Sequence, residues 1–269
     1  MNNIRIIPDT RYRGEGISQG LARGLLVYYE DLNLTGEGMG IGSVALRNPA
    51  CTYFSRSWSD SWEAGVLTRT FVLDTRMSWC IWGKQSNLLT CLIESGISAY
   101  MKLPWFQSII MVPVLPLGAL FGISRSFEPI PPRGKVTFAY QATGNHIDVH
   151  VEIDGQVGPN DTLCLLNELS ALWFTRGWDG KRPVSPPPGW EKVSSAELSV
   201  SLVDPLHGIR FCMSRPSVTP IVPFTVFRGR EKSGDTCWAG FCIELSSLDG
   251  SLGFPEVRYC IDIVQGAGS

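Results

Sequence analysis

The chain has 269 residues, of which 18% are charged and 44% are hydrophobic, and its formal net charge is -2. This balance indicates a folded chain and excludes the low hydrophobicity and high charge that are typical of disorder. A net charge so close to zero supplies no general attraction for phosphate, so we expect no nucleic-acid partner.

The eight cysteines are scattered among apolar residues. No CxxC pair marks a zinc site, and a chain of this length does not need a disulfide framework. The N-terminal residues contain no apolar segment followed by a cleavage site, so no secretion signal is expected. These features predict free thiols and a cytoplasmic location.

Several strand candidates follow in the first part of the chain. A row of alternating glycines starts at Gly36 and ends at Gly42, and in a strand it leaves one face without side chains. We expect that face to pack closely against another part of the protein, with contact to a ligand as the alternative. The strand candidates are Arg23–Tyr29, Met39–Arg47, Cys51–Ser57, Val66–Leu73 and Leu88–Ile93.

The segment Leu103–Ile123 contains 21 residues without a charge. It is long enough to cross a membrane as a helix, but three prolines interrupt it, so no transmembrane span is predicted. Two buried strands, or a strand and a loop, are expected instead. Besides filling the core, so apolar a segment suits a pocket for a hydrophobic molecule, with Trp105 and Phe106 as candidate ligand-binding residues.

Period-two alternation of apolar and polar residues predicts antiparallel strands in four later segments. They are 135–140, 196–203, 237–245 and 256–264, and His207–Ser214 and Ile221–Arg228 are less regular candidates. Many strands joined by short turns favour a mainly β fold, either an antiparallel β-barrel or a β-sandwich.

One α-helix is expected to pack on this sheet, at about residues 162–176. Asp161 suits the start of the helix, and Arg176 followed by Gly177 suits its end. The apolar residues between them recur at helical spacing; they are Leu163, Leu166, Leu169, Trp173 and Phe174.

The proline-rich stretch at residues 177–191 is the best candidate for a domain boundary or a lid. Only 78 residues follow it, which is small for an independent β domain. We therefore predict a single domain over residues 1–269. Two β halves joined by this stretch are the alternative.

The densest group of polar residues lies in the segment Gly144–Gly155. In an extended strand, His146, Asp148, His150 and Glu152 share one face. Imidazoles beside carboxylates suit general acid–base catalysis or the binding of a divalent metal, so these four are the candidate catalytic residues. The alternative is a solvent-exposed face whose mixed charges keep the sheet hydrated.

Four more residues stand where loops are expected: Trp58, Trp62, Trp178 and Asp179. Tryptophan beside a carboxylate suits a sugar or another flat or oily molecule, so we treat them as candidate ligand-binding residues; the alternative is that the rings anchor loops.

Three functions remain open. The first is a cytoplasmic β protein that binds a hydrophobic or aromatic small molecule and needs no cofactor. The second is an isomerase, lyase or hydrolase that uses the His146–Glu152 face for acid–base or metal-assisted chemistry, with a divalent metal as cofactor. The third is a protein-interaction module. We favour binding, because the apolar excess is the larger feature of the sequence.

Overall fold

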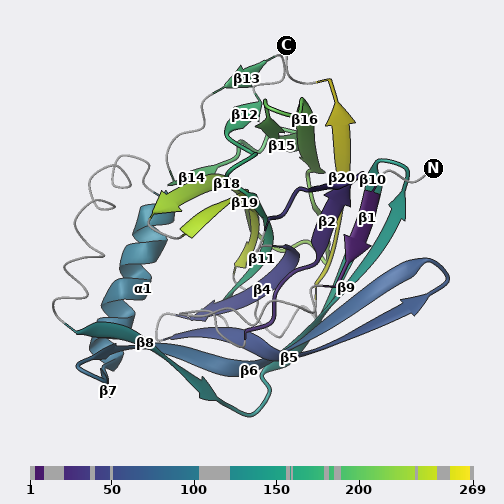
Figure 1. The fold of residues 1–269 in the computed structure, drawn as a ribbon. Coiled ribbons are helices and arrows are strands. Elements are labelled where there is room, and N and C mark those ends of the chain that lie inside the picture. The colour runs from purple at the N-terminus through teal and green to yellow at the C-terminus, as the bar shows by residue number, and fades with distance from the viewer. Residues whose placement is uncertain are drawn as a thin grey trace.

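The computed structural model describes residues 4–8, 21–36, 40–48, 51–102, 122–155, 158, 160–178, 182–184, 189–233, 236–246 and 255–266. Within them lie a small N-terminal sheet, one helix and a large antiparallel sheet (Figure 1). The small sheet consists of β1 (Ile4–Ile7), β2 (Leu26–Tyr29) and β3 (Leu32–Asn33).

The large sheet contains the remaining described strands. In chain order they are β4 (Ile41–Asn48), β5 (Cys51–Glu63), β6 (Val66–Ile81), β7 (Lys84–Gln85), β8 (Ile123–Pro129), β9 (Gly134–Thr143), β10 (His146–Gly155), β11 (Thr162–Ser170), β12 (Arg176–Trp178), β13 (Pro183–Val184), β14 (Gly189–Lys192), β15 (Ser199–Asp204), β16 (Ile209–Ser214), β17 (Ser217–Thr219), β18 (Phe224–Ser233), β19 (Thr236–Ser246) and β20 (Glu256–Gln265).

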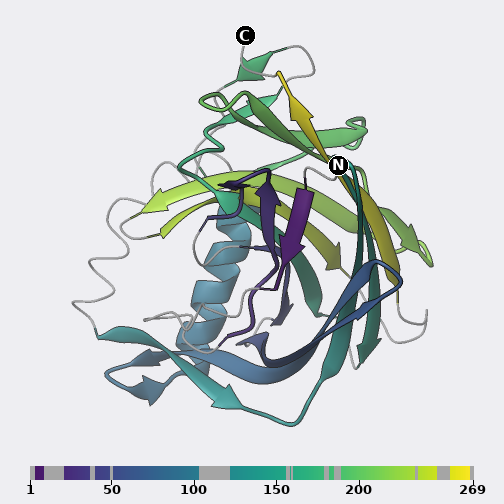
Figure 2. The same cartoon turned by 45° about the vertical axis from the view of Figure 1, so that its right-hand side comes forward.

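Antiparallel pairing links these strands in the order β14-β18-β19-β11-β4-β5-β6-β9-β10-β20-β16-β15-β12-β13. Strands β7 and β8 extend the pairing of β6, and β17 extends that of β20. For the described residues the order ends at β14 and β13. The sheet curves strongly around its own core (Figures 1 and 2), so it is sandwich-like.

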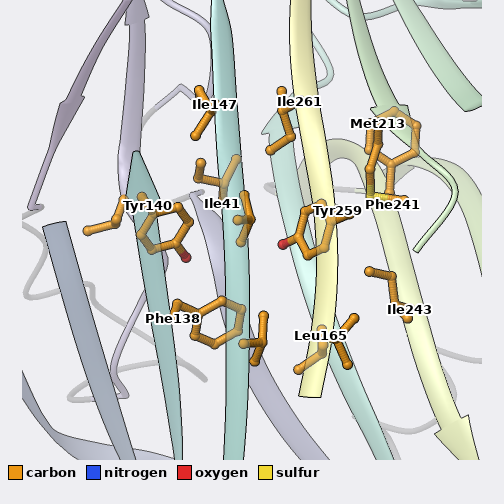
Figure 3. Packing of buried hydrophobic residues seen from close by; sticks show 14 of the residues in the cluster. Ile41, Phe138, Tyr140, Ile147, Leu165, Met213, Phe241, Ile243, Tyr259 and Ile261 are labelled. Carbon is orange, nitrogen blue, oxygen red and sulfur yellow. The ribbon is translucent and has the colours of Figure 1, made fainter. Parts of the chain in front are cut away.

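The prediction of a mainly β, antiparallel protein is confirmed. Alternation is clearest in strands with one buried face, because each inward side chain there leaves water and stabilises the fold by about 1.5–3 kcal/mol. In the two clearest examples the inward residues are at most 5% exposed; they are Ile147, Val149, Val151 and Ile153 in β10, and Val257, Tyr259, Ile261 and Ile263 in β20. Figure 3 shows part of this core.

The predicted helix at residues 162–176 is wrong. Residues Thr162–Ser170 form β11, a central strand that pairs with β19 on one side and β4 on the other. Both faces of β11 are largely buried: Leu163 and Leu165 face the main core, and Cys164 lies in a second cluster. A strand buried on both faces carries apolar residues without alternation, and its leucines then mimic helical spacing.

The helix in the described residues is α1 (Asn87–Lys102), so the strand predicted at Leu88–Ile93 is also wrong. A short apolar run does not distinguish strand from helix by its period, whereas the cap does. Ser86 supplies that cap, since its Oγ accepts a hydrogen bond from the amide of Leu89 at 3.2 Å. The helix packs against β6 and β14 (Figure 1). In the part of the chain described here, no helix combines the length and hydropathy needed to cross a membrane.

A buried amide joins four strands inside the core. Asn167 of β11 accepts hydrogen bonds from the amide of Gly42 in β4 and from the hydroxyl of Tyr259 in β20, both at 3.1 Å. Its Nδ2 lies 3.7 Å from the sulfur of Met213 in β16. Burial raises the pKa of Tyr259, so its hydroxyl keeps the proton that it donates. These contacts connect β4, β11, β16 and β20 across the core.

Strands from before and after residues 177–191 pair directly, as in β10 with β20 and β11 with β19. The division of the chain into domains, and the boundary or lid role of this stretch, remain predictions. Trp105, Phe106 and Asp179, with all of residues 103–121, lie outside the described residues.

Candidate functional site

The polar residues of β10 lie on its outer face, as the alternation in the sequence predicts. His146, Asp148, His150 and Glu152 point away from the core, because the residues between them are buried in it. Strand β20 lies alongside β10 in antiparallel register. The shared face of the four residues is therefore correct, while their catalytic role remains a prediction.

His146 lies between two carboxylates. Its Nδ1 is 2.7 Å from Oδ1 of Asp262 in β20, and its Nε2 is 3.1 Å from Oδ1 of Asp148. The hydrogen bond with Asp262 raises the pKa of His146, burial of the ring opposes this rise, and Asp148 adds to it. Sequence reasoning found Asp148 but missed Asp262, which stands 116 residues away in the chain.

His150 makes a separate set of contacts. Its Nε2 lies 3.3 Å from Oε2 of Glu256 in β20, and its Nδ1 lies 4.0 Å from Oε1 of Glu152. Glu256 also accepts a hydrogen bond from Arg258 at 3.2 Å. The structure therefore divides the four predicted residues into two groups, one around His146 and one around His150.

Cys260 joins the group around His146. It lies directly opposite Asp148 in the pairing of β10 with β20, two residues before Asp262. The ligand atoms of His146, Cys260 and Asp262 all lie within 4.8 Å of one another. The alternation of β20 puts Cys260 and Asp262 on its outer face, but only the pairing brings them to His146.

Two open grooves adjoin this group. The Arg210 groove has a volume of about 710 Å³ and is lined by His146, Asp262, Asn145, Ser199, Arg210, Ser214, Gln265 and neighbouring residues of β16 and β20. The His150 groove has a volume of about 580 Å³ and is lined by residues that include Asp148, His150, Arg215, Arg258 and Cys260. Volumes of this size suit small molecules.

No protein-family model matches the sequence, and no curated protein matches it. Among solved structures, the chain is similar to a mutant of heparan sulfate lyase HepC from Pedobacter heparinus, with 10% identity and a TM-score of 0.47 over 95% of this chain and 32% of that one. It is also similar to heparinase III, the BT4657 gene product, with 8% identity and a TM-score of 0.45 over 93% of this chain and 31% of that one. The chain thus spans about a third of each of these structures.

Trp178 contacts a residue of the Arg210 groove. The guanidinium of Arg210 lies over the Trp178 ring, 4.6 Å from its centroid. Such a stack holds the cation in place. Nε of Arg210 is buried and has no hydrogen-bond partner in the described part of the chain.

The other two tryptophans of the sequence prediction lie elsewhere. Trp58 and Trp62 stand on β5, in the hairpin with β6, and are 45% and 60% exposed. Neither lines one of the two grooves. The structure therefore does not bring them together with Trp178.

A second group of potential metal ligands is buried between β11 and β19. Cys164, Cys242 and Glu244 place their ligand atoms within 4.8 Å of one another. Glu244 forms an ion pair with Arg47 of β4. The hydrogen bond with Cys164, and then burial, raise the pKa of the Cys242 thiol, which favours its protonated form.

Proposed function

We propose that the protein binds a polar small molecule with a carboxylate or phosphate group in the Arg210 groove. The observation that carries this proposal is the guanidinium of Arg210, which is stacked on Trp178 and has a buried Nε without an acceptor in the described residues. A guanidinium that is held in place on a groove wall can donate charge-assisted hydrogen bonds from its other nitrogens to a carboxylate or phosphate group.

Uncharged hydrogen-bonding groups line the groove beside this cation, together with Asp262 and His146, which pair with each other. Ser214 accepts a hydrogen bond from the amide of Cys260 at 2.8 Å, and a hydroxyl that accepts can also donate. Asn145, Ser199 and Gln265 add further polar atoms along the groove. A few placed polar groups beside a charged side chain are typical of sites that orient a small molecule.

This ligand differs from the hydrophobic or aromatic molecule that the sequence suggested. That suggestion depends on the aromatic loops and on Leu103–Ile123, most of which lies outside the described residues, whereas the Arg210 groove combines apolar residues with several polar and charged ones. Binding without chemistry remains the favoured function. The cytoplasmic location and the lack of a nucleic-acid partner remain predictions from composition.

Acid–base catalysis is the second candidate function, and His150 is the residue that favours it. Glu256 lies 3.3 Å from its Nε2, and a carboxylate in this position orients an imidazole for proton transfer. The ring also lines the His150 groove. If the His150 groove binds a substrate, His150→Ala will abolish its turnover and leave phosphate binding by Arg210 intact.

We expect Arg210→Met to weaken anion binding by about 10- to 100-fold, because hydrogen bonds to a charged group contribute about 1.5–3 kcal/mol. Isothermal titration with inorganic phosphate and with citrate measures the affinity, and NMR shifts of the Ser199 and Gln265 amides locate the ligand. Arg258→Met is the matched control, since Arg258 lines only the other groove and is paired with Glu256. Equal affinities in wild type and Arg210→Met, or shifts confined to other surfaces, would contradict the proposal.

A further inference from the structure

Three different donor atoms converge at the junction of the two grooves. His146 offers a ring nitrogen, Cys260 a sulfur and Asp262 a carboxylate oxygen, all within 4.8 Å of one another. The strand pairing sets this arrangement: His146 is directly opposite Asp262, and Cys260 is two residues away on the same face of β20. Because regular strands hold these residues, the donors are already gathered before any ligand binds.

The set of donors selects a type of ion. Imidazole, thiolate and carboxylate are all ligands of zinc, whereas magnesium and calcium prefer oxygen atoms alone. A thiolate and a carboxylate together carry the charge that neutralises a divalent cation, and a neutral imidazole adds none. Binding requires Cys260 to lose its proton, which passes to the solvent.

A further contact orients the imidazole. Asp148 lies 3.1 Å from Nε2 of His146, while Nδ1 faces Asp262. A histidine that binds a metal through one nitrogen usually donates the proton of its other nitrogen to a carboxylate, which sets the tautomer and the ring position. Asp148 therefore has the place of this orienting carboxylate.

We propose that His146, Cys260 and Asp262 bind one zinc-like divalent transition-metal ion, with Asp148 orienting the imidazole and a fourth coordination position open to the Arg210 groove. The three side chains belong to partly buried residues, and His146 and Asp262 line that groove. Three protein ligands with an open fourth position are typical of metal sites that also bind water or a small molecule. The proposal goes beyond the anion site and does not require it.

The buried group of Cys164, Cys242 and Glu244 supplies an internal comparison. Arg47 already neutralises Glu244, so a cation there competes with a guanidinium. Neither cysteine lines one of the two grooves. Substitution of Cys164 therefore removes a thiol of similar chemistry without touching the proposed site.

The experiment is a titration of the full chain with zinc alone, after treatment with a chelator, by native mass spectrometry and calorimetry. We expect one zinc ion per chain. His146→Ala, Cys260→Ser and Asp262→Asn should each lower the affinity at least about 100-fold, and Asp148→Asn about 10- to 100-fold. Cobalt in place of zinc should give a sulfur-to-cobalt absorption band that Cys260→Ser abolishes.

Three controls separate this site from the other possibilities. His150→Ala and Cys164→Ser should bind zinc as wild type does, and Arg210→Met should bind zinc while losing phosphate. Circular dichroism checks that each variant is folded. No zinc binding by the wild type, unchanged affinity in Cys260→Ser, or loss of zinc in Cys164→Ser overturns the proposal. Zinc binding without phosphate binding would overturn the anion site alone.

Discussion

Replacement of Asp60 by alanine is expected to lower the free energy of unfolding by about 3–5 kcal/mol, because it leaves a buried guanidinium without its anion. Arg69 of β6 is 1% exposed and lies directly opposite Asp60 of β5. Its Nε and Nη2 donate to the two carboxylate oxygens at 2.6 and 2.7 Å. Its Nη1 donates to the carbonyl of Arg23 at 2.7 Å, but a carbonyl supplies no compensating charge.

Denaturant unfolding of three variants tests this expectation. Asp60→Ala is compared with the double variant Asp60→Ala/Arg69→Met, which leaves no charge to bury and should recover most of the loss. Glu128→Ala is the control for an exposed ion pair, since Glu128 and Arg76 are each about 40% exposed, and it should cost less than about 1 kcal/mol. A loss below about 1 kcal/mol in Asp60→Ala would show that Arg69 finds another partner or reaches water.

Alternation in the sequence orients the side chains of strands whose two faces differ, and it is misleading in β11, where both faces are largely buried. In β10 and β20 every second residue is buried, so a local pattern suffices to orient the side chains. In β11 both faces are largely covered, by β4, β19 and the core, and the resulting run of leucines has no period of its own. The fold class was therefore accessible from sequence, but the position of the helix was not.

Some residues of the candidate site can likewise be identified from the local sequence pattern, and others cannot. His146 and Asp148 share a face for local reasons, and the sequence names both. Asp262 and Cys260 reach them only because β20 pairs with β10 in one register, across more than a hundred residues of chain. A shift of that register by one residue turns the carboxylate and the thiol into the core. Long-range pairing of this kind leaves no local signal in a single sequence.

Close packing of the glycine row is a sequence prediction that the structure confirms at Gly42. A Cβ built on Gly42 lies 1.6 Å from Oη of Tyr140, which is far inside contact distance. The residue also has a φ of +71°, where L side chains are strained. Both conditions require glycine at this point, where β4 meets the core.

Gly42→Ala is accordingly expected to destabilise the protein by about 3–5 kcal/mol, the sum of backbone strain and overpacking. Gly65→Ala isolates the strain, since Gly65 has a similar φ of +82° but no atom within 4 Å of a Cβ. It should cost only about 1–2 kcal/mol. Thermal or denaturant unfolding of the two variants measures the difference, which is the cost of the contact with Tyr140.

Tyr140→Phe then tests whether the Tyr140 hydroxyl causes the steric clash with a Cβ at position 42. Oη of Tyr140 is buried without a hydrogen-bond partner in the described part of the chain, although Figure 3 shows the hydroxyls of Tyr140 and Tyr259 turned toward each other. Removal of an unpaired buried hydroxyl should be neutral or stabilising by itself. In the Gly42→Ala background, the same change should restore part of the lost stability, since Cζ of residue 140 is still 2.9 Å from the new Cβ. If Tyr140→Phe alone is clearly destabilising, the hydroxyl has a partner in the folded protein. If it fails to rescue Gly42→Ala, the ring carbons or the strain at φ, and not the hydroxyl, make glycine necessary at position 42.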